Sequence, residues 1–326
     1  PRAANTADYM KGIGITPEAS QNNPILYDLF FETIWSENPY ELEEIDTAQW
    51  IRRYAERRYG ADSEAAYKAL MLYLDTVYNS ELNNLGQGAP ESVINARPAL
   101  SISAASTWGN SIITYDKAKF EEAVKYLLED YDTLKTSDAY LYDVADGLKQ
   151  LLSNTAQEYH QRMVEAFNGG DLDRFNQESE PFIGVIEMVD RVVGTRAEFM
   201  VGPWIEMAKK LAADTDDFTK SLYEFNARGL ITTWGASNNA NGGGLKDYSN
   251  RQWAGLTKDY YQPRWEKWIA ERQKELQGEP FEDVNWFNFE WAWTTAKNEY
   301  PTESSGEDLK ALAAVIFENY RISSIE

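Results

Sequence analysis

The sequence of 326 residues contains no cysteine and a single histidine, His160. The absence of cysteine excludes disulfides, thiolate catalysis and zinc–sulfur sites. One histidine is too few for a histidine-based zinc site, and it argues against a Ser–His–Asp triad. We expect His160 on a helix near Ala156 and Met163, where packing accounts for it. The composition therefore predicts a protein without a metal site, and we expect no cofactor.

Basic residues are also scarce, because 31 Lys and Arg stand against 53 Asp and Glu, for a net charge of −22. A surface this negative repels phosphate backbones, which excludes nucleic acid as a partner. No apolar run approaches the ~20 residues of a membrane-spanning helix. The glycine run 242–244 is not followed by Lys and Ser or Thr, so it is no phosphate-binding loop.

What the chain does contain is a long series of helical patterns. Hydrophobic residues make up 43% of the sequence and aromatic residues 13%, enough for a substantial core. Apolar spacing and capping residues predict a mainly α fold with about ten helices. Residues 80–115 read as one long loop, and loops of that length are functional or disordered. The expected helices are 25–35, 46–60, 63–77, 116–130, 137–168, 171–193, 203–213, 215–228 and 307–320, and two Trp- and Tyr-rich segments are 246–276 and 281–299.

The most informative stretch lies near the start, where the chain reads Gly12-Ile-Gly-Ile-Thr-Pro-Glu18. The alternation of Ile13 and Ile15 predicts a short buried strand, which Pro17 ends because proline cannot donate to a ladder. Glu18 would then project from the carboxyl end of the strand, where a (β/α) barrel keeps its catalytic residues. A single glutamate after a strand is common, so the pattern alone favours an ordinary strand–turn–helix with a solvated glutamate.

A second stretch runs from Asn226 to Gly235 as Asn-Ala-Arg-Gly-Leu-Ile-Thr-Thr-Trp-Gly. Its β-prone residues lie between two helices, which indicates a fixed and exposed Trp234. The alternative is a core tryptophan followed by a linker. After the loop 236–244 the chain continues as Leu-Lys-Asp-Tyr-Ser-Asn-Arg-Gln-Trp-Ala-Gly-Leu from Leu245. Taken alone, Arg228 and Asp247 fit a helix-end arginine and an N-cap aspartate.

Both stretches resemble the family 89 glycoside hydrolases, the α-N-acetylglucosaminidases. The family shows Gly-x-Gly-x-x-Pro-Glu, then Trp-Gly, then Asp-Tyr-x-Asn-x-Gln-x-Ala-Gly. Tyr-Tyr-Gln-Pro-Arg-Trp at 260–265 matches a further family motif that we interpret as structural. Arg97-Pro-Ala-Leu and Trp108 also have family counterparts, with no role assigned. Two departures are Ala19, where glycine is expected, and the insertion 238–244.

The resemblance implies roles for the residues in these motifs. Glu18 would be the catalytic nucleophile. Trp234 would stack on the terminal sugar, Tyr248 would hydrogen-bond with it, and Leu245 would add an apolar wall against the N-acetyl methyl. Arg228 and Asp247 would support the pocket.

The resemblance also implies the activity and the domain organisation. Residues 1–36 would be the last β/α segment of a catalytic (β/α)8 barrel, and 37–326 a helical domain that contributes to the sugar pocket. The parent would be an exo-acting, retaining α-N-acetylglucosaminidase that needs no cofactor. Retention requires two carboxyls. The acid/base glutamate is expected upstream, so this fragment alone should be inactive. Its partners would be a glycan with terminal α-linked N-acetylglucosamine and the upstream barrel of the same protein.

Two alternatives from other classes remain open. One is a non-catalytic helical module that binds carbohydrate or serves as a scaffold, and the other is a platform for protein partners. The chain opens on Pro1, so we expect it to be cut from a longer protein whose targeting signal is not read here. The absence of cysteine and of Asn-x-Ser/Thr acceptors favours a bacterial source over an animal lysosomal glycoprotein. The expected location is therefore secreted or periplasmic.

Overall fold

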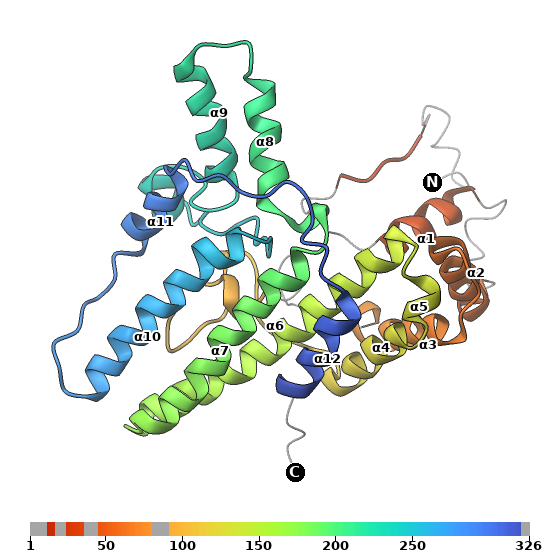
Figure 1. Cartoon of the computed structure of the whole chain (residues 1–326), viewed down its shortest axis with the longest axis horizontal. Coiled ribbons are helices and arrows are strands. Elements are labelled where there is room, and N and C mark those ends of the chain that lie inside the picture. Colours follow the sequence, from red (N-terminus) through yellow and green to blue (C-terminus); the bar gives the residue numbers. More distant parts are fainter. Residues whose placement is uncertain (1–11, 17–23, 36–44, 80–90, 321–326) are drawn as a thin grey trace, which may run out of the picture. The chain divides into compact units, whose positions relative to one another are not determined.

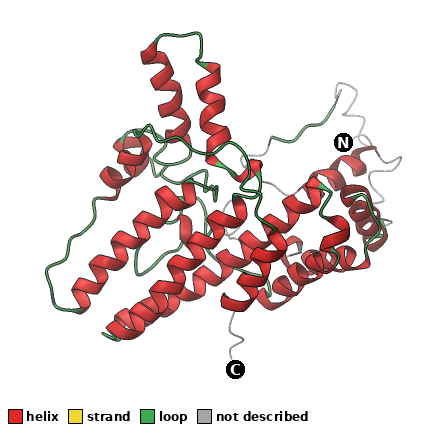
Figure 2. Ribbon diagram, viewed as in Figure 1, coloured by secondary structure: helices red, strands yellow, loops and turns green. Residues whose placement is uncertain are grey.

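The computed structural model describes residues 12–16, 24–35, 45–79 and 91–320. These residues form helices joined by loops, as Figure 2 shows. In place of a sheet, the described residues contain a single parallel bridge, between Met200 and Ala254. The mainly helical fold predicted from the sequence is therefore confirmed. The chain divides into two compact units, Pro1–Trp50 and Ile51–Glu326, and each is described by itself.

The first unit contains α1, Pro24–Trp35, and the start of α2, Thr47–Tyr59. Helix α1 confirms the helix predicted from 25 to 35. It buries Ile25, whereas Phe30 is 38% exposed. Residues 12–16 are exposed and have no regular secondary structure. The strand expected there does not form among the described residues, since a strand exists only by pairing with a neighbouring backbone.

The second unit is built on two long helices, α6 (Asp138–Asn168) and α7 (Leu172–Val193), which pack against each other along their length (Figure 1). The side chains of Ser137 and Asp171 cap these helices by accepting backbone N–H groups at 3.4 and 2.9 Å. The facing side chains are buried completely and make the core of the unit, among them Leu148, Leu152, Phe182, Val185 and Val189.

The other helices of this unit surround the central pair. Helix α3 continues into the π-helix η3 and packs on α4, while α10 packs on α7 and α12 contacts both long helices. Most predicted helix ends lie within two residues of the observed ones, because Ser63 and Asp116, where two of the predicted helices begin, cap α3 and α4 with their side chains. The bounds are Glu64–Tyr73 for α3, Leu74–Tyr78 for η3, Lys117–Glu129 for α4, Tyr131–Leu134 for α5, Gln262–Leu276 for α10, Trp286–Thr294 for α11 and Leu309–Asn319 for α12.

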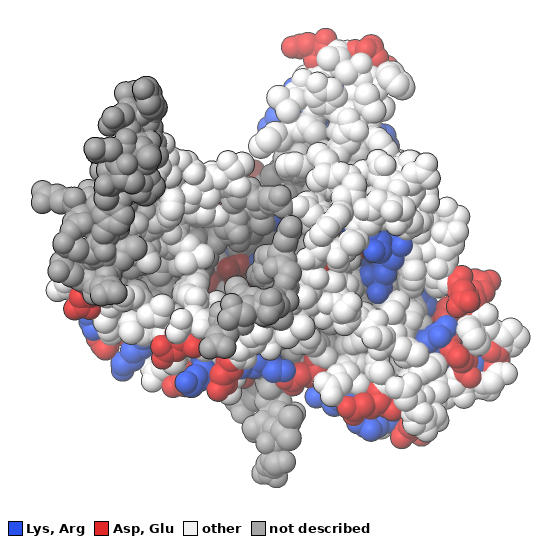
Figure 3. Space-filling model, turned by 180° about the vertical axis from the view of Figure 1, so that it is seen from behind, with Lys and Arg blue, Asp and Glu red and all other residues white. Residues whose placement is uncertain are grey.

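Helices α8 (Val201–Leu211) and α9 (Asp217–Leu230) form a hairpin that projects from the second unit (Figure 1). Acidic side chains gather at its tip in Figure 3, where Asp214 and Asp216 are exposed. Helix α9 is capped by Asp216, which accepts from Thr219 N at 3.0 Å, and not by Thr215, the first residue of the helix predicted at 215–228 and a good capping residue itself. No helix among the described ranges is long and apolar enough to span a bilayer.

The remaining chain of this unit consists of irregular segments that hold the candidate site. One is 91–116, in which the 3₁₀ turn η4 (Val93–Asn95) is the regular element. The other is 231–256, which contains the π-turn η6 (Asn238–Gly242) and leads into η7 (Thr257–Tyr261). The short turn η5 (Ala197–Phe199) precedes α8. Residues 91–115 thus confirm the described part of the long loop predicted at 80–115.

Candidate substrate-binding site

Trp234 lies in a tight turn directly after α9. Its backbone N donates to the carbonyl of Gly229 at 2.7 Å, which reverses the chain at the end of the helix. Its φ is +58°, and the Gly235 that follows has φ +130°. The segment therefore forms a turn and not the β-like structure that its residues favour. The indole is half-buried, as a ring with one face toward the protein and one toward solvent would be.

Tyr248 is carried next to Trp234 by a second turn. The backbone N of Asp247 donates to the carbonyl of Thr232 at 2.7 Å, which ties the two turns together. The rings of Trp234 and Tyr248 then meet edge to face, with centroids 5.4 Å apart and planes at 79°. Leu245 is half-buried in the same turn, where its carbonyl accepts from Tyr248 N at 3.3 Å. The structure thus brings together the three residues proposed for sugar contact.

The backbone of this site is unusual for the chain. Among the described residues, the non-glycine residues with positive φ are Trp234, Asp247 and Asn250, at +58°, +53° and +52°. Asparagine and aspartate tolerate this conformation, but a bulky residue such as tryptophan does so at a cost. Strained residues cluster at functional sites, where the surrounding structure holds them in place. All three lie in the two turns that carry the aromatic pair.

Asp247 does not cap a helix. Its carboxylate belongs instead to a buried ionic network beneath the turn. Arg264 Nη1 donates to Asp247 Oδ2 and to Glu290 Oε1, both at 2.8 Å, and all three side chains are fully buried. Arg97 donates to the two oxygens of Glu290 at 2.9 and 2.6 Å. Burial raises the pKa of Asp247 to about 6, although the guanidinium of Arg264 opposes the rise. The expected supporting role of Asp247 therefore has a concrete structural basis.

Arg228 belongs to a different buried cluster. Its guanidinium pairs with Glu224 and donates to the carbonyl of Asn298 at 2.5 Å. It also lies over the rings of Trp293 and Tyr300, at 4.9 and 5.7 Å from their centroids. Arg228 is thus more than a helix-end charge, since it fastens the last turn of α9 just before the turn of Trp234.

The remaining residues of the Asp-Tyr-x-Asn-x-Gln-x-Ala-Gly motif are anchors. Asn250 accepts from Asn95 Nδ2 at 2.7 Å, and Gln252 exchanges hydrogen bonds with Ser153 on α6. Gly255 donates its backbone N to Asp190 on α7 at 2.8 Å. It has φ +84°, and a Cβ there would stand 2.6 Å from the ring of Tyr300. The motif is therefore a strap that holds Tyr248 to the helical core.

Glu290 is a site residue that sequence reasoning missed, and the roles of Arg97 and Arg264 were not resolved. The available signal was a single carboxylate within the aromatic helix Trp-Phe-Asn-Phe-Glu-Trp-Ala-Trp, because a charge in such a helix needs a buried partner. The structural interpretation of residues 260–265 is confirmed, since Tyr260, Tyr261 and Trp265 are buried. His160 packs edge to face on Trp265 and bonds the carbonyl of Ala99, as its packing role requires.

Glu18 lies outside the described residues, so its role as nucleophile stays a prediction. The part of the chain that the structure describes contains no group of three or more His, Asp or Glu side chains that could hold a metal ion. Within the second unit, a space beside Gln150, Ser153 and Gln157 measures about 10 Å³, which is too small for a sugar. A larger groove of about 330 Å³ is lined by residues of α7 and α10, and none of the aromatic residues of the two turns lines it. The second unit is thus a helical domain with an aromatic site carried on its loops.

Comparison with known proteins identifies the domain. The model of the α-N-acetylglucosaminidase (NAGLU) C-terminal domain family matches residues 50–318, and the chain belongs to this family. Human α-N-acetylglucosaminidase is 31% identical over 317 residues, which cover 95% of this chain and 40% of the human protein. The resemblance inferred from the two motifs is thereby confirmed.

Solved structures agree. A family 89 glycoside hydrolase from Clostridium perfringens in complex with PUGNAc is 48% identical, with a TM-score of 0.92 over 99% of this chain and 36% of that one. A double Glu-to-Gln variant of the Clostridium perfringens enzyme, bound to its substrate GlcNAc-α-1,4-galactose, matches with the same identity and TM-score. The chain spans about two fifths of the length of these relatives.

Proposed function

We propose that this chain is the C-terminal part of an exo-acting, retaining α-N-acetylglucosaminidase that removes terminal α-linked N-acetylglucosamine from glycans. The observation that carries the proposal is the aromatic pair Trp234 and Tyr248, carried by two turns with left-handed residues next to a buried ionic network. Family membership supports it, because the relatives are named as glycosidases of this kind.

In this proposal each pocket residue contacts a different part of the terminal sugar, according to its chemistry. Trp234 stacks on the apolar C–H face of the terminal pyranose, and Tyr248 hydrogen-bonds its hydroxyls at the rim of the ring. Leu245 packs on the N-acetyl methyl. Asp247 and Arg228 touch no sugar and hold the two turns through their buried ion pairs.

Glu18 is the proposed nucleophile, and the acid/base carboxyl comes from an upstream barrel. Retaining hydrolysis needs two carboxyls about 5–5.5 Å apart, one to form the glycosyl–enzyme bond and one to protonate the leaving oxygen. Residues 1–36 are the proposed last barrel segment and 37–326 the helical domain. The exposed apolar side chains of the first unit, such as Leu26 at 52%, suit a surface that another domain covers. A bacterial source is part of the proposal, in line with the 48% identity to a clostridial protein, and so is a secreted or periplasmic location, which is inferred from the sequence alone.

The nucleophile is tested by Glu18→Ala in the complete enzyme that contains this chain. Hydrolysis of an aryl α-N-acetylglucosaminide should fall by several orders of magnitude, because no glycosyl–enzyme bond can form. Azide should restore part of the rate with an activated leaving group. The control is Glu56→Ala on the exposed face of α2, which should keep normal turnover. Normal turnover by Glu18→Ala would assign the nucleophile elsewhere.

The isolated 326-residue chain tests the division of the two carboxyls. It should not hydrolyse an aryl α-N-acetylglucosaminide at all, since it lacks the acid/base residue. Turnover by the purified chain would show that both carboxyls lie within it. A complete enzyme without glycosidase activity that still binds N-acetylglucosamine would instead favour the non-catalytic module.

A further inference from the structure

Trp108 extends the aromatic pair by one more ring. Its indole meets Tyr248 edge to face, with centroids 5.7 Å apart and planes at 88°, and Tyr248 in turn meets Trp234 edge to face. Trp108 lies on an irregular segment and its side chain is 42% exposed. A single exposed apolar ring is ordinary by itself, so what sets Trp108 apart is its contact with Tyr248 and the way its segment is held.

The segment that carries Trp108 is held by a buried carboxylate. Glu91 Oε2 accepts from the backbone N of Ala105 at 2.7 Å and of Ser106 at 3.0 Å, and Oε1 accepts from Ser106 Oγ at 2.5 Å. Glu91 N donates to the carbonyl of Asn110 at 2.6 Å. Charge-assisted bonds of this kind are among the strongest in proteins. The backbone is thus fixed on both sides of Trp108.

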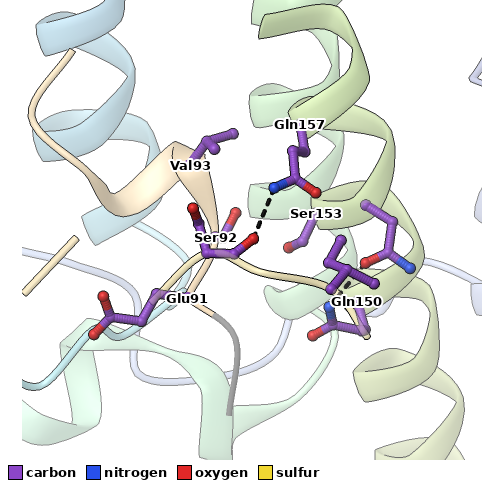
Figure 4. A pocket seen from close by; sticks show the side chains of 9 residues that line it. Glu91, Ser92, Val93, Gln150, Ser153 and Gln157 are labelled. Carbon is purple, nitrogen blue, oxygen red and sulfur yellow. Dashed lines mark hydrogen bonds between the residues drawn. The ribbon is translucent and has the colours of Figure 1, made fainter. Parts of the chain in front are cut away.

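Two further features leave this segment little freedom. A Cβ on Gly109 would stand 2.0 Å from the carboxyl carbon of Glu91, so any larger residue directly after Trp108 would displace that carboxylate. Figure 4 shows the carboxylate of Glu91 on the side of its segment away from Gln150 and Ser153 of α6. Glu91 therefore reaches outward from the core to the segment that it holds.

The same segment is also docked on the insertion that precedes Tyr248. Thr107 Oγ1 donates to the carbonyl of Gly244 at 2.6 Å. Gly244 has φ +66°, and a Cβ there would stand 2.2 Å from that hydroxyl. The insertion 238–244 is thus packed against the residue next to Trp108, and the position of Trp108 relative to Tyr248 is set by both loops.

We propose that Trp108 binds the sugar on the leaving-group side of the scissile bond, a hexopyranose, by stacking against its C–H face. The proposal rests on the function given above, in which Trp234 and Tyr248 hold the terminal sugar. In an exo-acting enzyme the next sugar of the glycan lies outward from the terminal sugar. Trp108 is an exposed ring that continues the row formed by Trp234 and Tyr248. Trp108 then determines which aglycones are accepted without touching the reacting atoms.

The test compares substrates with and without a sugar aglycone in the complete enzyme. The probes are GlcNAc-α-1,4-galactose and α-N-acetylglucosaminyl fluoride, together with the inhibitor 2-acetamido-1,2-dideoxynojirimycin. Trp108→Ala should lower kcat/KM for the disaccharide about tenfold, the size of one aromatic contact. The loss should be absent for the fluoride and for inhibitor binding, because neither has an aglycone sugar. Trp108→Phe, which keeps a flat ring, should recover part of the disaccharide activity.

Phe281 supplies a matched control, since it is 43% exposed and lies between α10 and α11. Phe281→Ala should leave all three measurements unchanged. If Trp108→Ala lowers kcat/KM for the fluoride and the affinity for the inhibitor as much as kcat/KM for the disaccharide, Trp108 only supports the position of Tyr248 and the inference is wrong. An unchanged kcat/KM of Trp108→Ala for the disaccharide would overturn the inference as well. If the wild-type enzyme hydrolyses neither substrate, the proposed function is wrong and the inference about Trp108 fails with it. The two contrary results for Trp108→Ala would overturn only the inference and leave the proposed function intact.

Discussion

Arg264 is the residue whose loss should reveal most directly how the site is held. Its guanidinium and the carboxylates of Asp247 and Glu290 are all fully buried, and both N–O distances are 2.8 Å. Its Nη2 makes a further bond of 2.6 Å to the carbonyl of Asn95. Water does not screen these contacts, so the ~0–1 kcal/mol typical of exposed ion pairs does not apply.

Arg264→Met would affect the two carboxylates unequally. Glu290 keeps its two bonds from Arg97. Asp247 Oδ2 loses its charged donor, and Oδ1 has no hydrogen-bond partner among the described residues. An ionised carboxylate left buried without a partner costs about 3–5 kcal/mol. We therefore expect a loss of that size in the free energy of unfolding at neutral pH or above.

The loss should depend on pH in a defined direction. Burial already raises the pKa of Asp247 to about 6, above the ~3.9 of an unfolded aspartate. The contribution of such a group is fully present below about pH 4 and is lost as pH rises through its folded pKa. Removing the opposing guanidinium raises that pKa further. Arg264→Met should therefore cost clearly less at pH 5, where Asp247 is protonated, than at pH 8.

Urea unfolding of the 326-residue chain, followed by circular dichroism at both pH values, measures these differences. Lys310→Met is the control, because it removes an exposed pair with Asp132 at 2.7 Å and should cost below ~1 kcal/mol. Arg264→Met combined with Asp247→Asn should be less costly than Arg264→Met alone, since no buried charge is left. If Arg264→Met costs no more than the control, or costs the same at pH 5 and pH 8, the reasoning is refuted.

Two further predictions concern the aromatic site and its strap. In the complete enzyme, Trp234→Ala should weaken binding of 2-acetamido-1,2-dideoxynojirimycin about ten- to a hundredfold, because one large apolar side chain contributes ~1–3 kcal/mol. Normal inhibitor binding together with a much lower melting temperature would instead show that Trp234 is a core residue. Gly255→Ala should destabilise the chain by about 1–3 kcal/mol more than Gly278→Ala in urea unfolding, because both glycines have positive φ but only at Gly255 does the added Cβ meet Tyr300, at 2.6 Å. Equal losses for the two glycine variants would show that Tyr300 moves aside without cost.

The helices of this domain could be predicted because their signals are local. Ser137 begins α6 and Gly169 ends it, as the sequence indicates, and Asp171 begins α7. Pro181 inside α7 did not interrupt the helix. The cap of α9 was misplaced by one residue, since Thr215 and Asp216 are both good capping residues and only the backbone geometry decides between them.

The site could be predicted only in part. The motifs gave Trp234, Tyr248 and Leu245, but the turn at Trp234 contradicts the β-propensity of its residues because tertiary bonds override it. The partners of Asp247 could not be read, since Arg264 and Glu290 lie in other elements and no local pattern joins them. The expected strand at 12–16 depends on neighbouring strands, which the described residues do not supply.

The segment 91–97 explains how such distant residues meet. It forms little regular structure beyond η4, yet Ile94 and Asn95 are completely buried. Trp265 Nε1 on α10 donates to the Ile94 carbonyl at 3.0 Å, which fastens the segment to the helical core. From there its side chains reach residues 105 and 106, Asn250, Glu290 and Asn241.

This arrangement sets an order of dependence. The helices fix 91–97, this segment fixes the loops of the site, and the loops fix Trp234, Tyr248 and Trp108. A change that shifts 91–97 while the helices stay intact should therefore reduce sugar affinity before it reduces the helical content of the chain. The stability of the helical domain and the geometry of its aromatic site are separable for that reason, although both rest on one core.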